Sequence, residues 1–478
     1  MYNITIRPIF VTLLILATIL FFAGIKNGVH AQPRTLSLQA TTTLLGSTES
    51  SLPFWFHANR DGSADPAGTN WINELGFNAG LYDDGVLSVD AGGHLVGRLS
   101  VDNALHFSRL FLKAEAGGYR LSAGRFIQPV GLNNHALSSG AMMVSRNAVP
   151  VPGISISTPD FLNVPLTGGV LQYKGMFAHR RFTGERYVEA PYLHQKYLYL
   201  RLNLGRFSGT GGIVHNAVWG GLHPDYGQLP KSFSDYLRVV LSRGAGEDSN
   251  VPRGEVTNVI GNSIAAYEFA AAYDFGNWSA SATRLFYLED GVSRRFRSPW
   301  DGVWGFNFTH GDPGRLIGAL TYEHINTKQQ DARNFQAIGR ANYYNHGIYR
   351  SGWASYGRTI GTPLFTYNPE TGRITNNMIV AHHTGMAGHL SPDLSYKLLA
   401  TYSRNYGVNG RIISPEELDL QQRRADQYSF YLAFLHRLPG TDHFSLSFAL
   451  AADRGTLYAN RFGILFGIQW NSVLKMPF

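Results

Sequence analysis

The last part of the chain, residues 462–478, alternates between apolar and other side chains. Every second position from Phe462 onward reads Phe, Ile, Phe, Ile, Trp, Ser, Leu, Met, Phe, and the positions between are mostly small or polar. Successive side chains of a β-strand point to opposite faces. The pattern therefore predicts a strand with one apolar face that ends on Phe478.

The same alternation recurs upstream in segments of about ten residues, which is the strand length of a membrane barrel. Short connections rich in Gly, Pro, Asn and Asp, the residues that suit tight turns, join these segments in pairs. We expect such turns near residues 83–85, 115–118, 205–209, 276–277, 311–314, 391–393 and 439–442, and long loops over 222–262, 290–300, 326–376 and 407–425.

Composition narrows the class of fold. Charged residues make up 15% of the chain, below the roughly 25% of globular domains, and aromatic residues make up 13%. The mean hydropathy is −0.13, and no apolar run downstream of the N-terminal region reaches the roughly 20 residues of a membrane helix. Low charge with alternating apolar positions is typical of a membrane β-barrel, which must close because open edges leave backbone groups unpaired in hydrocarbon. A secreted β-helix or a large sandwich is the alternative.

We therefore predict an all-β fold, a transmembrane antiparallel β-barrel of the bacterial outer membrane with about 18 strands. The even count places both termini on the short-turn, periplasmic side. The expected strands start near residues 52, 71, 85, 104, 119, 141, 168, 193, 209, 263, 278, 301, 315, 377, 394, 426, 443 and 461.

The N-terminus has the features of a secretory signal peptide. Arg7 precedes an apolar run over residues 9–24, and Val29-His30-Ala31 fits a small-residue cleavage site. We expect residues 1–31 to be removed after Ala31, leaving Gln32 first, and residues 32–51 to form a short periplasmic segment before a barrel over 52–478. A retained anchor helix is the alternative. The chain has no cysteine, which excludes disulfides and thiolate chemistry.

Several stretches resemble, in order and spacing, the Wzi-type capsule-assembly family of outer-membrane proteins in its Bacteroides-like branch. They are residues 52–62, 137–161, 254–262, 300–305, 343–353, 361–365, 381–388 and 394–407. The resemblance implies an 18-stranded barrel that binds capsular polysaccharide and helps attach or assemble the capsule, without catalysis. Separately, the alternating strand that ends on Phe478 resembles the C-terminal signature by which outer-membrane barrels are recognised for insertion, which implies barrel-insertion machinery as a partner. The best-known branch has a periplasmic helical bundle, for which residues 32–51 are too few.

The long loops are the expected place of surface function. Aromatic faces suit sugar rings, and guanidinium groups suit the carboxylates of acidic sugars. The 326–376 and 290–300 loops combine aromatic and arginine side chains. The residues of the 326–376 loop also suit a loop packed inside the lumen. The arginines of the 290–300 loop also suit a solvated or lipopolysaccharide-facing surface. The candidate polysaccharide-binding residues are Tyr343, Tyr344, His346, Arg350, Trp353, Arg358, Arg294, Arg295, Arg297 and Trp300.

Two loop segments have helical patterns. Residues 232–243 place apolar side chains three and four positions apart, as in one face of a helix. Residues 414–424 begin with Ser414, Pro415 and Glu417, which form a capping box with proline at the first helical position. We expect both helices to narrow the mouth of the barrel.

Enzyme signatures are absent from the sequence: it has no HExxH, GxSxG or P-loop motif. His382 and His383 are adjacent on a predicted strand and so face opposite sides. We expect no enzyme, metal or cofactor, and no nucleic-acid partner because the basic residues are dispersed. Besides polysaccharide, the expected partners are outer-membrane lipid and lipopolysaccharide. A substrate-specific diffusion channel is the alternative function, and a barrel enzyme is the third.

Overall fold

The computed structural model describes residues 34–246, 251, 255–256, 259–289, 298–330, 341–409, 419, 423–441 and 443–476. The predicted signal peptide with its cleavage site at Ala31 and Gln32 lies outside this part of the chain. So do Phe478 and most of the second predicted helix, residues 414–424. The processing site and the insertion machinery as a partner stay predictions.

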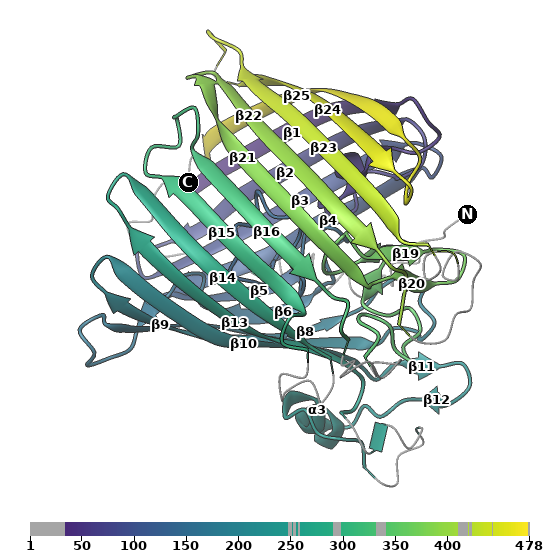
Figure 1. Cartoon of the computed structure of the whole chain (residues 1–478). Helices are drawn as coiled ribbons and strands as arrows, with labels where there is room; N and C mark the ends of the chain where they lie inside the picture. Colours follow the sequence, from purple (N-terminus) through teal and green to yellow (C-terminus); the bar gives the residue numbers. More distant parts are fainter. Residues whose placement is uncertain are drawn as a thin grey trace.

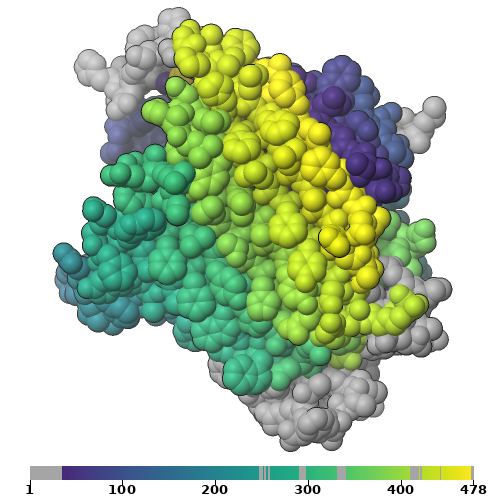
Figure 2. All heavy atoms as spheres, turned by 45° about the horizontal axis from the view of Figure 1, so that its top comes forward, coloured from purple at the N-terminus to yellow at the C-terminus, as the bar shows by residue number. Residues whose placement is uncertain are grey.

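The described residues form a closed antiparallel barrel of 18 strands (Figure 1). Nineteen strand segments make up the sheet, and β6 (Gly153–Ser157) and β7 (Leu162–Asn163) share one position because both pair with β8 (Leu171–Arg181). β1 (Arg34–Ser47) pairs with β25 (Arg461–Met476) and closes the wall. Figure 2 shows the two ends of the chain side by side in the wall. The predicted fold class and strand count are confirmed.

The remaining wall strands follow one another around the barrel. They are β2 (Asn70–Asp83), β3 (Leu87–Leu99), β4 (Ala104–Ala116), β5 (Tyr119–Arg125), β9 (Tyr192–Leu204), β10 (Phe207–Trp219), β13 (Asn262–Asp274), β14 (Trp278–Leu288), β15 (Gly302–His310), β16 (Ala319–Asn326), β21 (Ile379–Ser391), β22 (Leu394–Asn405), β23 (Ala425–Arg437) and β24 (Phe444–Gly455). Three small hairpins lie in the loops: β11 (Leu222–His223) with β12 (Gly227–Gln228), β17 (Ala354–Ser355) with β18 (Arg358–Thr359), and β19 (Thr366–Asn368) with β20 (Arg373–Asn376).

The predicted alternation is visible in the wall. On β25, Phe462, Ile464, Phe466 and Ile468 are exposed on the outside, whereas Leu465 between them is buried. Outward positions of a membrane barrel contact lipid chains, so apolar side chains are stable there without protein neighbours. The interior positions are therefore free to hold polar residues.

The connections differ at the two ends of the barrel, as the sequence predicted. Two to eight residues join β4 to β5, β9 to β10, β13 to β14, β15 to β16 and β21 to β22 at one end. The long loops gather at the opposite end, which we call the mouth (Figure 1). α3 (Phe233–Val240) lies in one of these loops and confirms the helix predicted over residues 232–243. The expectation that this helix narrows the mouth is wrong, because its Tyr236 ring packs against His179 and Trp219 on the outer face of the wall. No helix among the described residues is long and apolar enough to cross a membrane.

The start of the barrel differs from the prediction. Residues 32–51 were expected to be a periplasmic segment, but β1 occupies most of this range and pairs with both β25 and β2. The strand expected near residue 52 is instead the helical turn α2 (Phe54–His57), in which Phe54, Trp55 and Phe56 are all buried. A wall strand would place one of three consecutive aromatic residues on the opposite face, so burial of all three favours a turn inside the barrel.

The strand expected near residue 141 is also displaced. Residues 126–152 leave the wall after β5 and return to it at β6. Their apolar side chains Val130, Leu137, Met142 and Met143 are buried in the main cluster of the structure. We call this inward segment the plug.

The pairing of β1 with β25 predicts a disulfide in a cysteine-free chain. Thr41 lies opposite Gln469, and Cα atoms of directly opposed antiparallel residues are about 4.5–5.5 Å apart, within reach of a disulfide. We expect Thr41→Cys with Gln469→Cys to cross-link on oxidation and to change the mobility of the boiled, non-reduced protein. Thr41→Cys with Ser395→Cys, on the distant β22, is the control. A periplasmic segment at residues 32–51 would give no cross-link in either pair.

Candidate functional site at the mouth of the barrel

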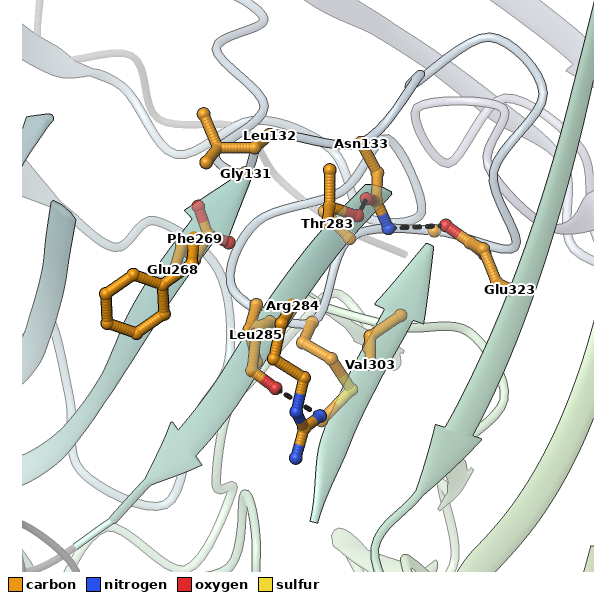
Figure 3. Close-up of a pocket in the computed structure, with 13 residues that line it drawn as sticks. Gly131, Leu132, Asn133, Glu268, Phe269, Thr283, Arg284, Leu285, Val303 and Glu323 are labelled. Carbon is orange, nitrogen blue, oxygen red and sulfur yellow. Dashed lines mark hydrogen bonds between the residues drawn. The ribbon is translucent and has the colours of Figure 1, made fainter. Parts of the chain in front are cut away.

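The plug is fixed to the barrel wall by polar side chains that point inward. Glu323 on β16 accepts hydrogen bonds from the side chain of Asn133 (2.8 Å) and from the backbone and hydroxyl groups of Ser139 (2.8 and 2.5 Å). His383 Nε2 on β21 donates to the carbonyl of Leu137 (2.8 Å). Figure 3 shows Asn133 between Glu323 and Thr283. A buried carboxylate that accepts three hydrogen bonds stabilises the segment that supplies the donors.

The space left between plug and wall is small. The cavity in Figure 3 lies between the plug and strands β13 to β16 and has a volume of about 20 Å³. This is room for about one water molecule. A sugar ring does not fit there, whereas the long loops at the mouth offer exposed side chains.

The predicted aromatic residues of the 326–376 loop pack onto the plug. Tyr343, Tyr344 and Trp353 are each at most 1% exposed. Trp353 Nε1 donates to the carbonyl of Met143 (2.8 Å), and the Tyr344 hydroxyl donates to that of Met142. The structure therefore favours the second interpretation of this loop, in which its aromatic residues fill the lumen.

Arg358 and His346 also have structural contacts. The guanidinium of Arg358 donates to the backbone carbonyls of His57 (3.0 Å) and Ala64, and burial lowers the pKa of Arg358 to about 10, which leaves it charged at neutral pH. His346 Nε2 lies 3.5 Å from a carboxylate oxygen of Glu255. Both residues tie the 326–376 loop to neighbouring segments.

Two predicted residues reach the surface. Trp300 is 65% exposed, and Arg350 is exposed beside the Tyr187 ring. Arg294, Arg295 and Arg297 lie outside the described residues.

Arg350 belongs to a cluster that the sequence analysis did not identify. Its guanidinium carbon lies 4.4 Å from the centroid of the Tyr187 ring, and the Tyr187 hydroxyl donates to Asp225 (3.1 Å). Tyr226 is exposed, and its ring centroid lies 4.6 Å from that of His223. We call Tyr187, His223, Asp225, Tyr226 and Arg350 the rim cluster. Its members come from three loops, so no local motif predicts it.

A second exposed aromatic residue lies on the other side of the 182–191 loop. The Tyr356 hydroxyl is 2.9 Å from that of Thr183, and Arg125 donates to the same threonine (3.2 Å). Gly184, between these groups, has φ +94°, and a Cβ there would lie 2.7 Å from the Tyr356 ring. The close approach of the ring thus requires glycine at position 184. The 182–191 loop therefore holds Tyr187 and contacts the exposed Tyr356 of the 326–376 loop.

Residues 57–370 match the family described as Capsule assembly protein Wzi. The chain belongs to this family. A search of curated proteins gave no match. The predicted resemblance and the location in the bacterial outer membrane are confirmed.

Solved structures show the same fold. The outer-membrane protein Wzi of Escherichia coli, described as a carbohydrate-binding β-barrel involved in group 1 capsule assembly, has a TM-score of 0.57 at 14% identity, over 92% of this chain and 85% of that one. OccD3 (OpdP) of Pseudomonas aeruginosa has a TM-score of 0.50 at 10% identity, over 94% of this chain and 95% of that one. At these identities the likeness concerns the fold.

The contact between Glu255 and His346 predicts a pH-dependent mouth. Burial raises the pKa of Glu255 to about 7, and burial lowers the pKa of His346 to about 4. A carboxyl group whose pKa is raised on folding stabilises the folded form fully below about pH 4.5. This stabilisation falls as the pH rises and is lost once the pH passes about 7. The lowered pKa of His346 has the opposite effect, because the folded form loses stability as the pH falls, but this applies only below about pH 6.5.

Between pH 6.5 and 8 we therefore expect the loop packing around Glu255 to weaken by roughly 1 kcal/mol. The measurement is the rate of proteolytic cleavage in the 341–378 region of the otherwise intact barrel. Glu255→Gln, which keeps the shape without the titration, should cleave at the same rate at both pH values. An equal pH dependence in the variant would show that another group is responsible.

Proposed function

We propose that this protein binds capsular polysaccharide at its mouth and helps attach or assemble the capsule at the cell surface, without catalysis. The observation that supports this most directly is the rim cluster, in which the exposed guanidinium of Arg350 lies over the half-buried ring of Tyr187, close to the exposed ring of Tyr226. Membership of the capsule-assembly family supports the same role, and the similar structure from Escherichia coli is described as carbohydrate-binding.

The chemistry of the rim cluster suits an acidic polysaccharide. Exposed tyrosine rings stack on the apolar faces of sugar rings at a small cost in conformational entropy. Arg350 can bind a carboxylate with two parallel hydrogen bonds, and Asp225 can accept a hydrogen bond from a sugar hydroxyl. Several such weak contacts along a repeating polymer add up through multivalency. Binding of this type needs no bond to be broken.

Replacing Tyr187 and Tyr226 by Ala should weaken binding of the purified protein to the capsule of its own cells by roughly 1–3 kcal/mol in total. Replacing Arg350 by Ala should weaken it more at low salt than at high salt, because exposed charges are screened. Isothermal titration with capsular oligosaccharides measures both effects.

The matched control is Tyr119→Ala, a tyrosine at the short-turn end of the barrel that is 45% exposed, close to the 39% of Tyr226. We expect this variant to bind like the original protein. Cells with the rim variants should release capsule into the medium while still making it. Unchanged binding in folded rim variants would place the glycan elsewhere on the molecule.

The filled lumen makes a prediction about the alternative function, a diffusion channel. The plug and the 341–378 region bury their large side chains against each other inside the barrel. We therefore expect purified protein in planar bilayers to show no steady open-channel current. Glu323→Gln, which weakens charge-assisted bonds to the plug, should increase brief openings. A stable conductance in the original protein would favour the channel.

A further inference from the structure

α3 lies on the outside of the barrel, where it covers side chains that point away from the lumen. Its Tyr236 ring lies 5.2 Å from His179 on β8, 5.8 Å from His194 on β9 and 5.6 Å from Trp219 on β10, measured between ring centroids. These three residues have the same strand parity as Phe177, Leu198 and Ile213, which are exposed on the outer wall. Figure 1 shows α3 beside the wall at the mouth end.

The helix has three different faces. Val239 and Asp235 are buried against the protein, and Ser234 and Arg238 form a polar face. The third face is apolar and uncovered among the described residues: Phe233, Leu237 and Leu241 are 73%, 43% and 60% exposed. They recur every four residues and so form one stripe along the helix. An exposed apolar stripe beside a polar one is typical of a helix at a membrane surface.

A groove of about 590 Å³ lies on the membrane side of α3. β9 runs from the mouth at Tyr192 to the short turn after Leu204, so Leu198 lies deeper in the membrane than Lys196. The groove extends from the end of α3, at Val240 and Leu241, to Leu198 on β9. Its apolar lining includes Phe177, Leu198, Ile213, Val240, Leu241 and Leu288.

One basic side chain lines the mouth-facing end of the groove, and a second follows a lining residue in the chain. Lys196 lines it and donates a hydrogen bond to the carbonyl of Val240, at the end of α3. Arg243 is exposed and directly follows Ser242, which lines the groove. The lining carboxylate Glu289 accepts a hydrogen bond from the backbone of Tyr344 (3.0 Å). The charge at this boundary therefore suits an anionic head group.

We propose that this groove is a binding site for the lipid A part of lipopolysaccharide, with an acyl chain in the groove and a phosphate beside Lys196. Lipid A combines several acyl chains with phosphates at the height of the membrane surface where α3 lies. A groove in a lipid-facing wall is filled by hydrocarbon, because a void there would leave its lining without contacts. Basic residues at the surface add attraction to the anionic head group. This site is independent of the proposed glycan binding at the rim.

Native mass spectrometry of the full-length barrel with added lipid A tests the proposal. The pair Lys196→Met with Leu241→Ser should weaken lipid A binding by about fivefold or more. The matched control is Arg454→Met with Phe462→Ser, which removes an exposed basic and an exposed apolar side chain at the mouth end of the opposite wall. Equal weakening in both pairs would show only non-specific lipid binding. If the original protein bound phosphatidylglycerol as tightly as lipid A, the choice of lipid A as the ligand would be overturned.

A second measurement does not depend on binding affinity. The chain has no cysteine, so a single dye can be placed at Leu241→Cys or, as a control, at Ser234→Cys on the polar face. In vesicles that contain lipids with brominated acyl chains, the dye at position 241 should be quenched and that at position 234 should not. Equal quenching at the two positions would contradict the placement of α3 in the membrane surface.

Discussion

The hydrogen-bond ladder between β1 and β25 is the constraint on which the rest of the structure depends. It runs from Arg34 opposite Met476 to Ser47 opposite Gly463, and it removes the last open edges of the sheet. Unpaired backbone groups cost several kcal/mol each in hydrocarbon, so the wall is stable in a membrane only when closed. Closure fixes which positions face lipid and which face inward. The plug and the loops packed on it use the inward positions.

The inward polar residues place the plug, and the plug places the loops. Glu323 and His383 hold the plug against β16 and β21. The carbonyls of Met142 and Met143 then accept hydrogen bonds from Tyr344 and Trp353. Because these large side chains are used inside, the 326–376 loop presents Arg350 and Tyr356 at its surface instead. The rim is therefore a consequence of how the lumen is filled.

How much could be predicted from the sequence follows from the range of each interaction. The strands and short turns near the C-terminus are determined by alternation and local turn residues, and the structure confirms them. The count of 18 was right although residue 52 begins no strand and β1 was missed, since these two errors offset each other. Burial of Tyr344 depends on Met142, about 200 residues away, and loop composition contains no information about such a contact. The rim cluster forms only where three loops that are distant in sequence meet, so no single loop predicts it.

The loop between β10 and β13 connects the two surfaces proposed to bind ligands. Its hairpin β11–β12 provides Asp225 and Tyr226 to the rim, and Leu222 is paired with Glu189 of the loop that holds Tyr187. A few residues later Ser232 caps α3 through reciprocal hydrogen bonds with Asp235. The connection from rim to helix is thus short and ordered at both ends, which fixes their spacing. A polysaccharide at the rim and a lipid under α3 would lie side by side, so the position of the glycan relative to the membrane is set by the fold of one loop.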